Sequence, residues 1–89
     1  MPIIWIPPLL QKFTNGENQI EIDGNSIRQV IEELEKRYPG IKPRICDSEG
    51  KIRTEIAVAV DGEVAQTGVR TPVDPRSEIH FLPALSGGN

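Results

Sequence analysis

The last eight residues of the chain combine residue types that suit chemistry at a chain end: Leu82-Pro83-Ala84-Leu85-Ser86-Gly87-Gly88-Asn89. Proline has no backbone N–H, so Pro83 is predicted to end the pairing of a preceding strand. Glycine has no Cβ, so a glycine segment fits a narrow channel that excludes larger residues. Ser86, Gly87 and Gly88 are therefore predicted to thread into a partner protein, which would act on the Gly88 end.

The other reactive side chains are few and isolated. Cys46 is the single cysteine, which excludes an intrachain disulfide and a cysteine-held metal site, and we expect it to be a structural thiol. His80 has no serine or cysteine in an evident catalytic arrangement, so we expect it to face solvent or a partner. No metal site and no bound cofactor are predicted, and Trp5 is expected to pack in the core or on a sheet.

Composition argues against several classes of function. A chain of 89 residues suits one domain with one small core. The net charge of −3 and the dispersed basic residues are unlike those of a nucleic-acid-binding protein, which needs a basic patch for phosphates. No apolar run approaches the ~20 residues of a membrane span, and no signal peptide is apparent. We expect a cytoplasmic protein that binds neither nucleic acid nor membrane.

The elements that must position the tail are read from hydrophobic periodicity. Strands are predicted where β-branched residues cluster or alternate with polar ones, at residues 2–6, 19–23, 55–60, 63–65 and 78–82. The first two are expected to form an antiparallel hairpin, after Leu9 and Leu10 turn back to the core. Asp61-Gly62 is a strong signal for a tight turn between the third and fourth. A loop with one helical turn is expected over residues 41–53.

One long helix is predicted after Ser26, which serves as the N-cap, with Gln29 completing a capping box. Apolar residues then recur at helical spacing on one face, at Ile27, Val30, Ile31, Leu34 and Tyr38. The pairs Glu32–Lys36 and Glu33–Arg37 are expected on the opposite face, where Glu32, Glu33 and Glu35 form a solvated acidic surface. Pro39-Gly40 ends the helix.

These elements predict an α+β fold in which one helix packs on one face of a mixed sheet. The second sheet face then stays partly exposed. Leu82, Leu85 and part of the first strand are predicted to leave apolar surface there, which is typical of a protein that docks onto a partner. Leu82, Pro83 and Leu85 are the residues predicted to contact that partner.

The element order and the tail together resemble the small ubiquitin-like sulfur carriers of the MoaD/ThiS type. The resemblance covers nearly the whole chain. It is carried by three segments: Ser26-Ile27-Arg28-Gln29-Val30-Ile31-Glu32-Glu33-Leu34, Ile56-Ala57-Val58-Ala59-Val60-Asp61-Gly62-Glu63 and Glu78-Ile79-His80-Phe81-Leu82-Pro83-Ala84-Leu85-Ser86-Gly87-Gly88. It implies a β-grasp (ubiquitin-like) fold with four to five strands and one main helix, a domain over residues 1–83 and a flexible tail over residues 84–89. The Pro7-Pro8-Leu9-Leu10 region looks most like the carriers of a cysteine-biosynthesis route.

The resemblance also implies a chemical cycle at Gly88. An E1-like adenylating enzyme would activate the glycine carboxylate with ATP, and a sulfur donor would convert it to a thiocarboxylate. A sulfur-acceptor enzyme would then use the sulfur to make an amino acid (cysteine or methionine) or a cofactor (molybdopterin or thiamine). The chain itself would be a carrier and not an enzyme.

The chain departs from the family pattern at two places. Arg76-Ser77 stands where many members have Gly-Asp before the last strand, which is expected to change only the turn. Asn89 follows the glycine at which the active form of the family ends, so a peptidase is expected to cut between Gly88 and Asn89. Two other functions stay open: a protein modifier joined to targets through Gly88, and a non-covalent β-grasp interaction module.

Overall fold

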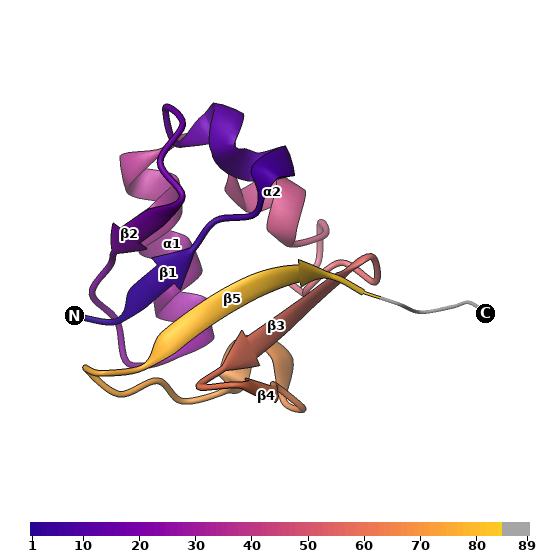
Figure 1. The fold of residues 1–89 in the computed structure, drawn as a ribbon. Coiled ribbons are helices and arrows are strands. Elements are labelled where there is room, and N and C mark those ends of the chain that lie inside the picture. Colours follow the sequence, from indigo (N-terminus) through magenta and orange to yellow (C-terminus); the bar gives the residue numbers. More distant parts are fainter. Residues whose placement is uncertain (85–89) are drawn as a thin grey trace.

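The computed structural model describes residues 1–84, which form one mixed sheet with a helix on one face (Figure 1). The strands are β1 (Ile3–Trp5), β2 (Gln19–Glu21), β3 (Ile56–Val60), β4 (Glu63–Val64) and β5 (Glu78–Pro83), in the spatial order β2-β1-β5-β3-β4. The pair β1–β5 is parallel and the other three pairs are antiparallel. The expected α+β fold and the two hairpins are confirmed.

The main helix is α1 (Ile27–Arg37), and it lies behind the sheet in Figure 1. Its first turn is capped by Ser26, whose Oγ accepts a hydrogen bond from the backbone N–H of Gln29. The Gln29 side chain accepts from the N–H of Asn25 at 3.0 Å, one residue before the position that a standard capping box uses. The predicted cap is therefore confirmed, with its return bond displaced by one residue.

The apolar face of α1 packs onto one face of the sheet to form the core. Ile27, Val30, Ile31 and Leu34 are buried with sheet residues from β1, β3 and β5: Ile4, Val58, Ile79 and Phe81. A 3-10 helix, η1 (Pro8–Phe13), closes one end of this core with Leu10. Leu9 stays 84% exposed, so the prediction that both leucines turn inward holds only for Leu10.

The two ion pairs predicted along α1 are wrong. Lys36 bonds to Glu33 at 3.2 Å, and Arg37 donates to the backbone carbonyl of Glu21 on β2. Glu32 instead binds Lys42 at 2.8 Å, because the chain turns at the helix end and brings α2 (Lys42–Ile45) alongside α1. Tertiary partners displace local pairs that are individually weak.

Glu35 is a structural residue, which corrects the prediction of a merely solvated acidic face. Its carboxylate accepts hydrogen bonds from the N–H groups of Gly40 and Lys42. These bonds hold the turn between α1 and α2, and the backbone N–H of Lys42, followed by that of Gly40, lowers the pKa of Glu35.

β5 continues through Pro83, contrary to the prediction that this proline ends strand pairing. Pro83 lies opposite Ile56 in the register, and the next N–H, that of Ala84, donates to Glu55 at 2.9 Å. In an antiparallel ladder alternate residues turn their N–H groups away from the neighbour. Pro83 occupies such a position toward β3, and β1 ends too early to pair on its other side, so no ladder bond is lost.

The turn between β3 and β4 has the predicted form. Asp61 and Gly62 both have positive φ, 53° and 86°, as a two-residue hairpin turn requires. No helix within residues 1–84 is long and apolar enough to cross a bilayer.

Candidate functional site: the exit of β5 and the surfaces beside it

β5 is the last strand, and the chain leaves it toward the tail beside the sheet face that α1 does not cover (Figure 1). Leu82 is 41% exposed and Pro83 is exposed, so two of the three predicted docking residues lie on accessible surface, although the strand alternation turns them to opposite faces of the sheet. Ala84 is the last residue that the structure describes. The other predicted site residues lie outside the described residues: Leu85, Ser86, Gly87, Gly88 and Asn89.

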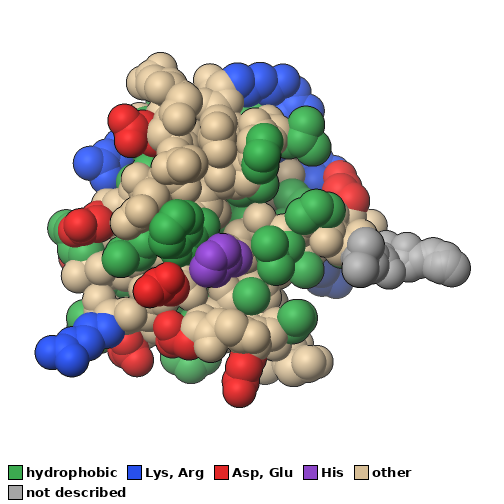
Figure 2. Space-filling view, viewed as in Figure 1, with side chains coloured by type: hydrophobic (Ala, Val, Ile, Leu, Met, Phe, Trp, Pro, Cys, Tyr) green, Lys and Arg blue, Asp and Glu red, His purple; other side chains and the backbone are tan. Residues whose placement is uncertain are grey.

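The sheet face opposite α1 carries a patch of apolar side chains. Strand alternation and register put these mostly apolar residues on it, with Ala59 buried among them and with Gln19, Glu21 and Glu78 beside them: Ile3, Trp5, Ala57, Ala59, Val64, His80 and Leu82. We call this set the docking face. Figure 2 shows hydrophobic side chains around the histidine, with acidic side chains beside and below them. The face extends to the end of β5, so a partner that covers it also meets the emerging tail.

Trp5 and His80 form the centre of the docking face. They are register partners on β1 and β5, and their rings stack with centroids 5.5 Å apart and planes 6° apart. The indole N–H donates to Glu78 at 3.1 Å. Trp5 thus packs on the sheet as predicted, and the stack gives the face a flat aromatic centre of the kind that dominates protein interfaces.

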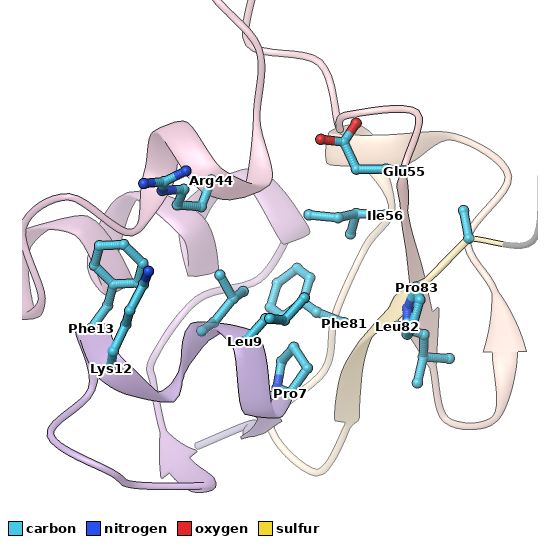
Figure 3. A pocket seen from close by; sticks show the side chains of 12 residues that line it. Pro7, Leu9, Lys12, Phe13, Arg44, Glu55, Ile56, Phe81, Leu82 and Pro83 are labelled. Carbon is cyan, nitrogen blue, oxygen red and sulfur yellow. The ribbon is translucent and has the colours of Figure 1, made fainter.

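A groove lies on the other side of the β5 exit, between β5 and η1. It has a volume of about 530 Å³ and is mostly apolar. Figure 3 shows Leu9 near Phe81 in its middle, Leu82 and Pro83 at one end, and Lys12, Phe13 and Arg44 at the other. The groove was not predicted from the sequence, because Leu9 was expected to turn into the core and because no local pattern places η1 next to Arg44.

The basic end of the groove is organised around one ring. The Lys12 ammonium and the Arg44 guanidinium lie 5.5 and 5.6 Å from the centroid of Phe13. Cations over an aromatic face are attracted by its π-electrons, so the ring brings together two cations from η1 and α2. Neither cation forms a salt bridge with a residue of the described range 1–84.

Cys46 has the environment of a structural thiol. It follows α2 as its C-cap and is buried in the core, and desolvation raises the pKa of the thiol. A raised pKa disfavours the thiolate, which is the reactive form. Within residues 1–84 no three His, Cys, Asp or Glu side chains are grouped to hold a metal ion. The described residues therefore form two exposed, mostly apolar surfaces, the docking face and the groove, around the end of β5.

Comparison with known proteins gives concordant results. A family model described as the ThiS family matches residues 5–88. The sulfur carrier protein CysO of Mycobacterium tuberculosis is 31% identical to the chain over 89 residues, which covers 96% of each sequence.

Two solved structures superpose closely on the fold. A chain in the crystal structure of the Amycolatopsis orientalis BexX/CysO complex has 31% identity and a TM-score of 0.89, covering 99% of this chain and 100% of that one. The crystal structure of Mycobacterium tuberculosis CysO has 28% identity and a TM-score of 0.90, covering 96% and 100%. With the observed strand order, these similarities confirm the β-grasp fold.

Proposed function

The chain belongs to the ThiS family of ubiquitin-like sulfur carriers, and from this premise we propose that it carries sulfur as a thiocarboxylate on Gly88. An E1-like adenylating enzyme activates the glycine, and a second enzyme accepts the sulfur. The carrier takes part as a co-substrate of both enzymes. One observation carries the assignment to Gly88: the match to the family model runs to that glycine.

The chemistry needs an activation step because a free carboxylate is a poor electrophile. A carboxylate oxygen of Gly88 attacks the α-phosphorus of ATP, and pyrophosphate leaves. A sulfide-level donor then attacks the acyl carbon of the adenylate, the bond to AMP breaks, and a thiocarboxylate remains. All catalytic groups belong to the partner, so the carrier contributes binding energy and positioning.

The surfaces around β5 support this role. The docking face puts an aromatic centre beside the exposed Leu82, and the chain leaves the sheet at Ala84 next to it. A partner docked on this face holds the tail at a fixed distance from its own active site. Glycines without side chains then enter a channel that larger residues would block.

Cleavage after Gly88 precedes activation, because only a terminal carboxylate can be adenylated. We assign the removal of Asn89 to a peptidase. The measurement is the intact mass of the protein purified from its own host. A population that retains Asn89 throughout, in cells that use the carrier, contradicts this step.

The direct test uses a form of the chain that ends at Gly88. With ATP, sulfide and the adenylating enzyme of its host, its mass is expected to rise by the difference between sulfur and oxygen. Gly88→Ala should slow charging by about 100-fold, as expected when a reacting group is displaced by about 1 Å. Ser86→Ala adds no bulk to the same tail and is expected to charge at nearly the wild-type rate. Equal charging of wild type and Gly88→Ala would refute the threading argument.

We propose that the sulfur acceptor acts in amino-acid synthesis, with cysteine or methionine as the product. The 31% identity to a sulfur carrier CysO over nearly the full length supports this choice. Carrier charged with radioactive sulfur and added to host extract should transfer label to free amino acids. Label that enters molybdopterin or thiamine instead would move the carrier to a cofactor route.

A further inference from the structure

We propose that the groove between η1 and β5 is a second docking site, which binds a segment of the adenylating partner that carries an apolar side chain next to a carboxylate. The inference rests on the proposed function, because it assigns to the partner that receives the tail a second contact with the carrier. The groove and the docking face adjoin at Leu82 beside the same exit, so one partner surface can span both.

The apolar half of the proposed site is preformed. Leu9 is 84% exposed, yet it follows two prolines, one of which opens η1. Proline fixes φ and limits the freedom of the backbone, so the backbone that carries Leu9 along the groove is already ordered before any partner arrives (Figure 3). Binding then costs the conformational entropy of the Leu9 side chain and little of its backbone.

The charged half selects the chemistry of the occupant. Lys12 and Arg44 share the end of the groove away from the tail, on a chain whose net charge is −3. Glu55 lies at the tail end. A partner carboxylate is therefore attracted to one end and repelled from the other, which fixes the direction in which the segment lies.

The backbone around the groove favours recognition through side chains. Pro7 and Pro83 line it, and neither has an N–H to donate. A partner strand that paired with β5 here would lack donors at these positions, and strand addition depends on such main-chain bonds. The apolar side chain and the carboxylate carry the interaction instead.

The test compares groove variants with tail variants in two separate measurements. Binding of the full 89-residue chain to the adenylating enzyme of its host is measured by calorimetry. Charging at saturating carrier concentration is measured with the form that ends at Gly88. Leu9→Ser and Arg44→Glu are the groove variants, and Arg76→Glu, exposed in the turn before β5, is the control for the change in charge.

The groove variants should each raise Kd by about tenfold or more, the loss expected when a leucine no longer becomes buried or an ion pair is reversed. Arg44→Glu should also make binding less sensitive to salt. The charging rate at saturating carrier concentration should stay within about twofold of the wild-type rate. Gly88→Ala is expected to show the reverse, with binding retained and charging slowed by about 100-fold. Thermal unfolding confirms that each variant is folded.

Other results overturn the proposal. If the groove variants bind like wild type while Gly88→Ala blocks charging, the proposed function stands and the groove inference falls. If wild type is neither bound nor charged, both fall. Tighter binding by Leu9→Ser would identify the groove as a resting place for the carrier's own tail. Loss of a self-associated form in Leu9→Ser would identify the occupant as a second copy of the chain.

Discussion

At the scale of the residue, Ser77 shows how one buried hydroxyl joins two turns. Its side chain is 2% exposed, accepts a bond from the N–H of Asp74 and donates to the carboxylate of Asp61. That carboxylate also accepts from the N–H of Glu78. The departure from the family pattern at Arg76-Ser77 therefore has a structural use, since it ties the β3–β4 turn to the start of β5.

Ser77→Ala should lower the free energy of unfolding by about 1–3 kcal/mol, because it removes two part-buried hydrogen bonds, one of them to the charged Asp61 carboxylate. Urea unfolding followed by circular dichroism measures the change. Ser48→Ala makes the same substitution at an exposed loop position and is expected to change stability by less than about 0.5 kcal/mol. Equal effects of the two changes would show that the Ser77 bonds contribute nothing.

At the scale of the element, short helices owe their position to a few side-chain bonds. α2 has four residues and no side-chain cap, which is too short to be stable alone. The Glu35 carboxylate fixes its beginning, and Lys42 binds Glu32 of α1. Because Arg44 on α2 forms part of the groove, these bonds at the end of α1 also place a residue of the proposed second docking site.

Stability should therefore fall in acid through Glu35. Its pKa in the folded chain lies below the ordinary 4.5 because N–H groups bond to the charged form. The unfolded chain then takes up the proton first, so the stabilisation is complete above about pH 4.5 and is lost as the pH falls through the lowered pKa. Thermal melts between pH 3 and pH 7 measure the effect. Glu35→Gln should reduce the fall of the melting temperature at low pH, whereas Glu17→Gln, at an exposed position in the turn before β2, should leave that fall unchanged.

The docking face yields a prediction at the same scale. Trp5→Ala removes the aromatic centre and should weaken binding to the adenylating enzyme by about 2 kcal/mol or more, roughly 30-fold in Kd. Arg28→Ala, exposed on the helix side of the sheet, is the control and should bind normally. Unchanged binding by a folded Trp5→Ala would remove the docking face from the interface.

At the scale of the whole molecule, the two faces of β5 have different roles: one packs in the core and the other forms part of the docking face. Phe81 is 2% exposed in the core, and its neighbour Leu82 is 41% exposed on the docking face. The central place of β5 between β1 and β3 puts the core and the interface on a single strand.

Alanine substitutions at these adjacent positions should affect different properties, stability at Phe81 and partner binding at Leu82. Phe81→Ala should lower the free energy of unfolding by about 3–5 kcal/mol, a large share of the ~5–15 kcal/mol of a small domain. Leu82→Ala should cost about 1 kcal/mol or less, yet it should raise Kd for the adenylating enzyme. Denaturant unfolding and calorimetry separate the two effects, and a stability loss at Leu82 as large as that at Phe81 would contradict the division.

Much of this architecture follows from the sequence because it depends on local pattern. The apolar repeat of α1, its Ser26 cap and the Asp61-Gly62 turn each encode their structure within a few residues. The errors concern contacts between distant segments. Lys42 replaced Lys36 as the partner of Glu32, and the effect of Pro83 depended on which neighbouring strand was present. The groove was not predicted because η1, α2 and the end of β5 come to line one groove only after the chain has folded.

The parallel pairing of β1 with β5 has a consequence for synthesis. A nascent chain on the ribosome holds β1 from the beginning, but the strand that must lie between β1 and β3 is made last among the five. Until the chain has been made as far as residue 81, the core lacks Phe81 or both Ile79 and Phe81, and the sheet has no complete strand at its centre. Prematurely terminated chains would therefore be unfolded substrates for cellular proteases, so that the pool of carriers contains only molecules whose translation has passed the last strand.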